Sequence, residues 1–154
     1  MAKKKPPPKG KELDADDYFA AAADHVEALP AIYNQGHYAL AIYAAGVAVE
    51  CLFRAFRERK GLPFRSDHPL SELALEAGFP DILPSRHRPR FHAALGGVSV
   101  RWRNSHRFRS NDAMRRFVKG LKLDRGIRGD FFKENARQAS SSAVELINLG
   151  AKQW

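Results

Sequence analysis

The chain has little cysteine and no long hydrophobic run. Cys51 is the single cysteine among 154 residues, which excludes a disulfide framework and a thiolate zinc site within one chain. The longest apolar run extends from Tyr38 to Val49, whereas a membrane-spanning helix needs about 18 residues or more. No apolar stretch follows the first lysines, so no secretory signal is expected. These absences predict a cytoplasmic protein with no membrane partner.

The length and composition predict one folded domain. Hydrophobic residues make up 44% of the 154 residues, enough for a sizeable core in a single domain. We expect that domain to span residues 14–154. The preceding residues, 1–13, hold five lysines and three consecutive prolines, a composition typical of a disordered basic tail that adds non-specific affinity for nucleic acid.

Acidic residues are rare between residues 86 and 128, where the net positive charge is concentrated. The whole chain has 26 basic and 17 acidic side chains, and this segment alone holds 13 basic and 2 acidic ones. The nine cations before Lys119 are all arginine, whose flat, forked guanidinium group binds phosphate and stacks on bases. Such one-sided charge is typical of a nucleic-acid-binding protein. The alternative is a solvated basic face without a partner.

Helical patterns run through the chain, and no two segments look like paired strands. Asp14 is a suitable N-cap for a first helix. Pro30 is expected to kink or end it, with a short continuation over residues 31–33. The segment 38–59 is apolar nearly all round in its first half, as in a central, buried helix. Other helices are expected near residues 71–77, 86–95, 111–122 and 131–149. The predicted fold is therefore all-α, an antiparallel up-and-down bundle of four to five helices.

One glycine pair predicts the end of a helix, and the spacing of the histidines bears on metal binding. Gly96 and Gly97 are expected to end the helix that begins near Arg86. The histidines show no metal-ligand spacing, and no acidic cluster with such spacing lies near the basic segment. We therefore predict neither a metal nor a cofactor.

The segment Val100 to Arg109 combines the residue types that bind nucleic acid. Arginines bind phosphates, and aromatic rings offer stacking faces for bases. Two interpretations of the aromatic rings remain open, since each can either stack on a base or anchor the core while the arginines face solvent. The candidate nucleic-acid-binding residues are Trp102, Arg103, Asn104, Arg107, Phe108 and Arg109.

Three stretches of the chain resemble the HEPN domain family. Tyr38 to Ala55 is similar to the alanine-rich second helix of these domains, with Glu50 followed by an apolar pair and Arg54. His68-Pro-Leu-Ser-Glu-Leu-Ala resembles the segment that follows that helix. Arg101-Trp-Arg-Asn-Ser-His106 fits the family's motif of an arginine and a histidine separated by four to six residues. The similarity spans roughly residues 14–149.

This resemblance implies a metal-independent endoribonuclease of toxin or defence type. It implies RNA or a nucleotide as the ligand, and two motifs meeting in a shared cleft of a homodimer. His106 would then transfer protons and Arg101 would stabilise the scissile phosphate, so these two residues are the catalytic candidates. On a regular helix a separation of five residues turns the chain by about 500°. The two side chains would then meet only by reach, by an irregular helix start, or across a dimer.

A second motif of the same family fits almost as well. Members associated with nucleotidyltransferases have a tryptophan, a few residues, and then Arg-Tyr, which resembles Trp102 followed by Arg107-Phe108. The alternative is therefore a non-catalytic binding module that partners a nucleotidyltransferase, an antitoxin or another protein. A basic RNA-binding protein unrelated to the family is the third possibility. Glu50 is the supporting residue, and it is expected either to pair with Arg54 or to reach the arginine motif.

Overall fold

The fold is a bundle of helices joined by turns. The computed structural model describes residues 13–66 and 69–154, and these contain no strand. The predicted tail, apart from Leu13, and His68 lie outside the described residues. The α-helices are α1 (Ala15–Asn34), α2 (Tyr38–Arg59), α3 (Leu70–Glu76), α4 (Phe79–Ile82), α5 (Arg88–Ser99), α6 (Asn111–Gly120) and α7 (Phe131–Ala151), and two 3-10 helices are η1 (Ser85–His87) and η2 (Asn104–Phe108). The prediction of an all-α fold is confirmed.

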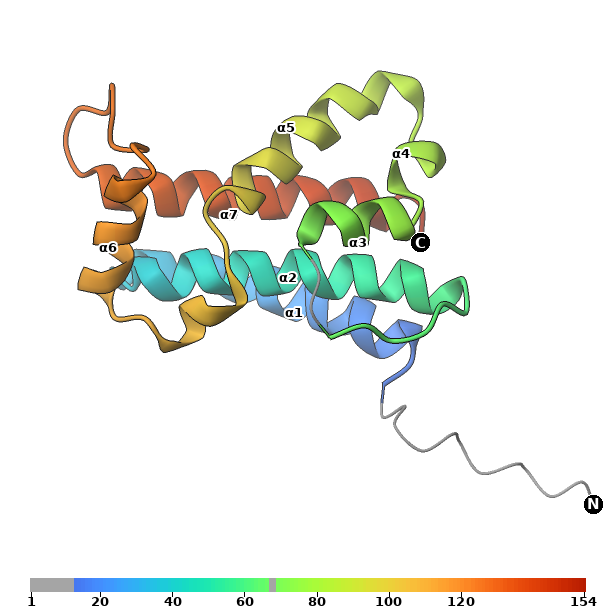
Figure 1. The fold of residues 1–154 in the computed structure, drawn as a ribbon. Helices are drawn as coiled ribbons and strands as arrows, with labels where there is room; N and C mark the ends of the chain where they lie inside the picture. Colours follow the sequence, from blue (N-terminus) through green and yellow to red (C-terminus); the bar gives the residue numbers. More distant parts are fainter. Residues whose placement is uncertain (1–12, 67–68) are drawn as a thin grey trace, which may run out of the picture.

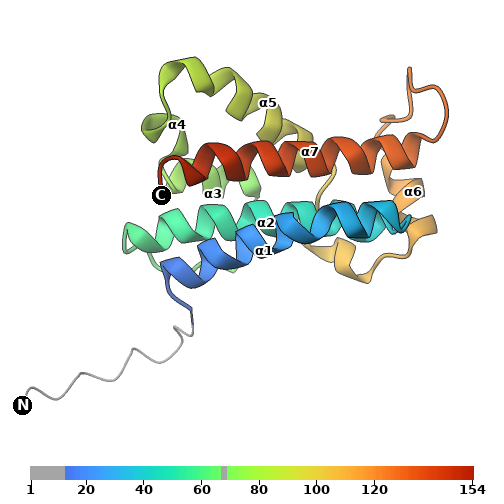
Figure 2. The same cartoon turned by 180° about the vertical axis from the view of Figure 1, so that it is seen from behind.

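The four longest helices alternate in direction along the chain. In Figures 1 and 2, α1 runs antiparallel to α2, and α5 runs antiparallel to α7. Both α1 and α7 pack against α2, and α5 packs against α7. The short α6 crosses one end of this arrangement, next to the start of α2 and α7 (Figure 1). This is the antiparallel up-and-down order that the sequence predicts.

Helix α2 lies at the centre of the core. Ile42, Val49, Leu52 and Phe53 are each 0% exposed, because neighbouring helices cover α2 on several sides. Among the described helices, α2 is also the one long and apolar enough to span a membrane by length and composition alone, yet two thirds of that window is buried inside the bundle. Such burial is what the core helix of a bundle requires.

The sequence predicts where α1 begins better than it predicts where α1 and α5 end. Asp14 caps α1, and its side chain and that of Asp17 accept each other's backbone N–H. Helix α1 does not end at Pro30 but continues to Asn34. The expected break at Gly96 and Gly97 is wrong, because α5 continues through both residues.

Close packing explains the continuation of α5. A Cβ atom on Gly97 would lie 2.2 Å from the Ser142 Oγ of α7. The missing side chain therefore lets α5 approach α7 closely, and the contact between the two helices offsets the low helix propensity of glycine.

Candidate nucleic-acid interface

The connection between α5 and α6 carries the arginine-rich segment. It consists of a turn after Ser99, the 3-10 helix η2, and an extended residue, Arg109. In Figure 1 this gold segment passes beside the first half of α2, and η2 contacts α2. Because the connection is irregular, its side chains do not follow one helical face. The predicted site residues accordingly separate into a buried group and an exposed group.

Arg101 belongs to the buried group. It is 7% exposed, and its Nε donates to Asn135 Oδ1 at 2.8 Å while Nη1 donates to the Gly97 carbonyl at 2.7 Å. Its Nη2 donates to Gln138 Oε1. Burial lowers the pKa of the guanidinium, and the charge of Glu134 opposes that shift. The guanidinium fork is therefore occupied by neutral acceptors on α5 and α7.

Trp102 is also buried, at 7% exposure. A Cβ atom on Gly46 of α2 would lie 1.9 Å from the indole Cδ1, so the ring fills the space that this glycine leaves open. The indole Nε1 donates to the Tyr43 carbonyl at 3.2 Å. Of the two interpretations of this ring, the core anchor describes its position in the structure. Its face is not accessible to a base.

His106 is 2% exposed and closes the turn of η2. Its Nδ1 accepts the Arg103 N–H at 3.1 Å, and its ring lies edge-on to Phe117 of α6 at 4.6 Å between centroids. Burial, together with the charges of Arg109 and Arg103, lowers the pKa of His106 to about 4. Since Nδ1 accepts a hydrogen bond, the proton of the neutral ring resides on Nε2. That Nε2 has no hydrogen-bond partner among the described residues.

The two catalytic candidates do not converge within one chain. The side-chain hydrogen bonds of Arg101 lead to α5 and α7, whereas His106 contacts α6 and lines a pocket at the start of α2. That pocket includes His106, Arg107 and Arg109 but not Arg101. A buried imidazole and a guanidinium whose three nitrogens each donate to the protein give this arrangement little capacity for proton transfer at a phosphate.

The exposed group consists of Arg103, Asn104, Arg107, Phe108 and Arg109, and we call it the Phe108 face. Phe108 is 79% exposed, more than any other large hydrophobic residue of the described chain. The guanidinium of Arg107 lies over the Phe108 ring at 4.7 Å from its centroid. An exposed ring with an arginine on it is the arrangement that stacks on bases in single-stranded nucleic acid.

A ring from α6 holds two arginines of the Phe108 face together. The guanidinium groups of Arg103 and Arg109 lie 5.8 and 5.3 Å from the centroid of Phe117. Within residues 13–66 and 69–154, no carboxylate forms an ion pair with Arg103, Arg107 or Arg109. Their charges are therefore available to an anionic ligand. Sequence reasoning missed Phe117, although a lone aromatic residue within a basic helix was the available signal.

Glu50 takes the first of its two expected roles. Its Oε1 accepts from Arg54 Nε at 2.9 Å and lies 2.7 Å from Arg54 Nη2. Arg54 in turn donates to the Arg65 carbonyl at 2.8 Å, so the pair fixes the loop that follows α2. Glu50 makes no contact with Arg101 or Arg107. It supports the fold rather than the Phe108 face.

Comparison with known proteins does not show a family for this chain. No family model, curated protein or solved structure matches this chain.

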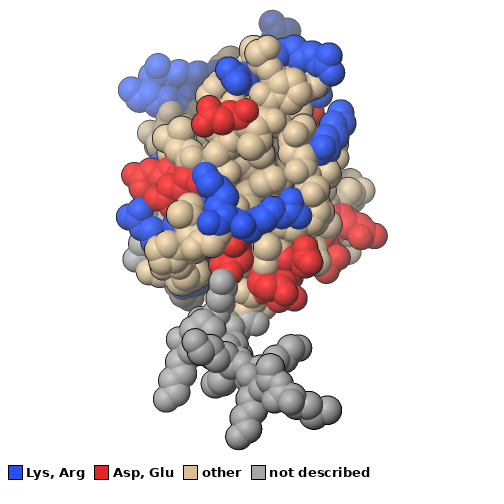
Figure 3. Space-filling view, turned by 90° about the vertical axis from the view of Figure 1, so that its right-hand side faces the viewer, with Lys and Arg blue, Asp and Glu red and all other residues tan. Residues whose placement is uncertain are grey.

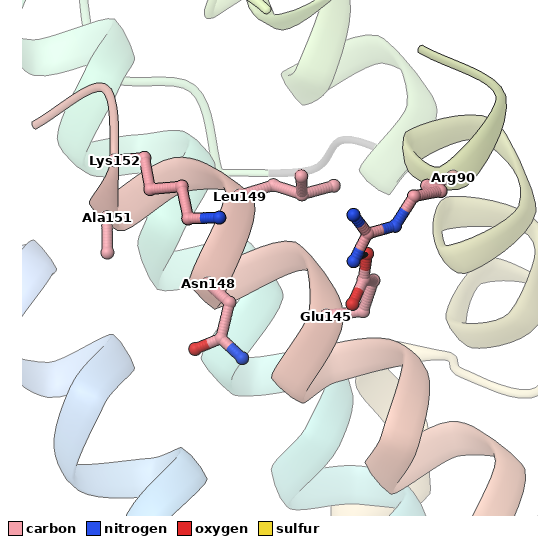
Figure 4. A pocket seen from close by; sticks show the side chains of 6 residues that line it. All are labelled: Arg90, Glu145, Asn148, Leu149, Ala151 and Lys152. Atoms are coloured by element: carbon pink, nitrogen blue, oxygen red, sulfur yellow. Dashed lines mark ion pairs between the residues drawn. The ribbon is translucent and has the colours of Figure 1, made fainter. Parts of the chain in front are cut away.

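The opposite end of the molecule differs in its electrostatics. Figure 3 shows that end, where lysine and arginine are interspersed with aspartate and glutamate. A pocket of about 430 Å³ lies there between α5 and α7. Its Arg90 forms an ion pair with Glu145 at 2.6 Å (Figure 4). Because Glu145 already neutralises this arginine, the pocket is a weaker anion site than the Phe108 face.

Proposed function

We propose that this protein is a non-catalytic, HEPN-like binding module that binds single-stranded RNA or nucleotides through the Phe108 face. The observation that carries the proposal is the exposed Phe108 ring with Arg107 over it, next to Arg103 and Arg109, which lie at the Phe117 ring. None of these three arginines has a carboxylate partner in the described chain. The ring supplies a stacking surface, and the arginines supply phosphate contacts. Further exposed cations follow on α6 and in the connection after it, including Arg115, Arg116 and Lys119.

Two observations favour the module over the endoribonuclease. Arg101 would have to leave its three acceptors to reach a phosphate. His106 would have to act as a general acid and base near neutral pH, although its pKa is lowered to about 4. A homodimer cleft would meet the same two obstacles, because both residues are occupied or buried inside each chain.

The test is binding of a fluorescent single-stranded RNA, followed by anisotropy. Replacing Arg103, Arg107 and Arg109 together with alanine is expected to weaken binding by about a hundredfold, since each lost arginine–phosphate contact costs about 1 kcal/mol. The matched control replaces Arg86, Arg88 and Lys152, three exposed cations that lie in η1, at the start of α5 and directly after α7. That control removes the same charge and is expected to keep most of the affinity. Equal losses in the two triple variants would contradict an interface at the Phe108 face.

The stacking contribution is tested separately with Phe108→Ala and Phe108→Tyr. The alanine variant is expected to weaken RNA binding by about tenfold, because stacking contributes on the order of 1 to 3 kcal/mol per base. The tyrosine variant keeps an aromatic face and is expected to bind like the wild type. If alanine and tyrosine bind equally well, Phe108 does not stack on the ligand.

Catalysis is tested on the same RNA in the presence of a chelator. We expect the RNA to remain full-length, and His106→Ala to make no difference. Cleavage by the wild type that disappears in His106→Ala would contradict the non-catalytic module and restore the endoribonuclease.

A further inference from the structure

An open pocket of about 270 Å³ lies between the start of α2 and the η2 segment. His37, Leu40 and Tyr43 line it from the α2 side, and His106, Arg107 and Arg109 line it from the other. This volume is below the roughly 300 to 1,000 Å³ of sites that enclose a whole drug-sized ligand. The pocket therefore suits one small group of a larger molecule.

The groups around this pocket favour a negatively charged ligand. Arg107 and Arg109 present exposed guanidinium groups, and the pocket lies at the N-terminus of a helix of 22 residues, where the helix dipole is positive. Asn111 Oδ1 accepts the Ala39 N–H at 3.1 Å, whereas the Leu40 N–H has no acceptor within the described part of the chain. His37, the N-cap residue, makes no side-chain capping bond. No carboxylate lines the pocket.

His106 gives independent evidence for a ligand. Its side chain is 98% buried and lines the pocket, and its Nδ1 is already occupied by the Arg103 N–H. The remaining Nε2–H is a buried donor without an acceptor in the described chain. A buried donor left without an acceptor costs about 1 to 3 kcal/mol, and a ligand oxygen would remove that cost.

From these donors we infer that the pocket binds a terminal phosphate group of RNA, with His106 acting as a hydrogen-bond donor beside Arg107 and Arg109. A terminal phosphomonoester carries close to two negative charges at neutral pH, which match the two guanidinium groups. An internal phosphodiester carries one negative charge, and the RNA chain continues on both sides of it. This inference rests on the proposed function, because the RNA reaches the pocket across the Phe108 face.

The experiment compares three single-stranded RNAs of one sequence, which end in a 5′-phosphate, a 3′-phosphate or hydroxyl groups only. The wild type is expected to bind one phosphorylated RNA about tenfold more tightly than the hydroxyl-ended RNA, and the preferred end gives the strand polarity. Equal affinity for all three RNAs would overturn the pocket and leave the proposed function intact. If none of the three binds, both the pocket and the proposed function fail.

Variants of His106 separate recognition from folding. In His106→Asn the side-chain oxygen keeps an acceptor near the Arg103 N–H but the distal donor is lost, whereas His106→Gln places an amide N–H near the position of Nε2. The asparagine variant is expected to lose the phosphate preference and retain binding of hydroxyl-ended RNA, and the glutamine variant is expected to regain part of the preference. A preference that is unchanged in a folded His106→Asn would overturn the role of His106.

An exposed residue keeps the test independent of folding at His106. Arg109→Ala is expected to reduce the phosphate preference to about twofold or less. Arg116→Ala, an exposed cation of α6 outside the pocket, is expected to weaken all three RNAs equally and keep the ratio. A ratio that falls equally in both variants would overturn the pocket.

Discussion

At the residue scale, burial decides what His106 can do. An imidazole in solution titrates near pH 6.5 and is a general acid–base group. In this fold the Phe117 ring and the charges of Arg103 and Arg109 surround it, and its pKa falls to about 4. The residue is therefore neutral at pH 7, and its Nε2–H has no acceptor among the described residues. The same side chain in an open position would have a different chemistry.

As the pH falls, protonation of His106 is expected to lower the free energy of unfolding of the protein. Because its pKa of about 4 in the folded state lies below 6.5 in the unfolded chain, the unfolded chain takes up the proton first as the pH falls. Neutral His106 therefore stabilises the folded state near pH 7. Between about pH 6.5 and 4 this contribution to the free energy of unfolding decreases by about 2 to 3 kcal/mol.

The measurement is the free energy of unfolding in urea at pH 7 and near pH 4.5. In His106→Gln this component of the pH dependence is expected to disappear, whereas His92→Gln, at an exposed position, is expected to keep it. A wild type and His106→Gln variant with identical pH dependence would contradict the prediction.

Arg101 is expected to stabilise the fold. In Arg101→Lys a single ammonium group replaces a fork that bonds to Gly97, Asn135 and Gln138. Buried acceptors are then left without donors, and we expect a loss of about 2 to 3 kcal/mol in the free energy of unfolding. Arg116→Lys, at an exposed position of α6, is the control and is expected to change stability by less than about 0.5 kcal/mol. Equal midpoints in urea would show that the Arg101 bonds contribute nothing.

At the scale of elements, glycines determine how closely the helices and the α5–α6 connection approach. Helix α2 accepts the Trp102 ring because position 46 has no side chain, and α5 approaches α7 because position 97 has none. Both glycines lie inside helices, where their propensity is poor. The packing they allow therefore outweighs their local cost.

Two glycine-to-alanine substitutions are expected to have opposite effects. In Gly46→Ala the new Cβ atom would meet the indole of Trp102 at 1.9 Å, so the ring must move, at a cost of about 2 to 3 kcal/mol. In Gly96→Ala the Cβ atom meets nothing within 4 Å, and the gain in helix propensity is about 0.5 to 1 kcal/mol.

Thermal unfolding measures both effects. We expect the melting temperature to fall in Gly46→Ala and to rise slightly in Gly96→Ala. The Gly46→Ala variant should also lose RNA affinity, because Trp102 holds the connection that carries the Phe108 face. A Gly46→Ala variant as stable as the wild type would show that the indole does not need this space.

At the scale of the whole molecule, charge is segregated. The segment 100–128, which runs from the end of α5 through α6, carries 10 of the 26 basic side chains and 2 of the 17 acidic ones. The fold places the α5–α6 connection and α6 near the start of α2 (Figure 1), whereas the end shown in Figure 3 mixes both signs. An anionic chain is therefore steered toward one side of the molecule.

This segregation predicts a steep salt dependence of RNA binding. For single-stranded RNA the slope of log affinity against log salt is about −0.7 for each phosphate contact. Replacing Arg103, Arg107 and Arg109 is therefore expected to reduce the slope by about 2. The triple variant of Arg86, Arg88 and Lys152 is expected to keep the slope of the wild type. Identical slopes in both variants would place the phosphate contacts elsewhere.

The sequence by itself determined the features that depend on neighbours along the chain. These include the all-α class, the N-cap at Asp14, the whole extent of α2 and the basic segment. Helical periodicity and capping act within a few residues, so they are readable without the fold. The pairing of Glu50 with Arg54 is equally local, since the two lie one helical turn apart.

Only the tertiary structure decided which residues of the Arg101–Arg109 segment face the core. Their directions depend on distant partners, namely Asn135 and Gln138 for Arg101, and the space at Gly46 for Trp102. The segment is an irregular connection without a helical period, so spacing alone could not separate the buried group from the exposed Phe108 face. Burial beside Phe117 also lowered the pKa of His106, which no local pattern encodes.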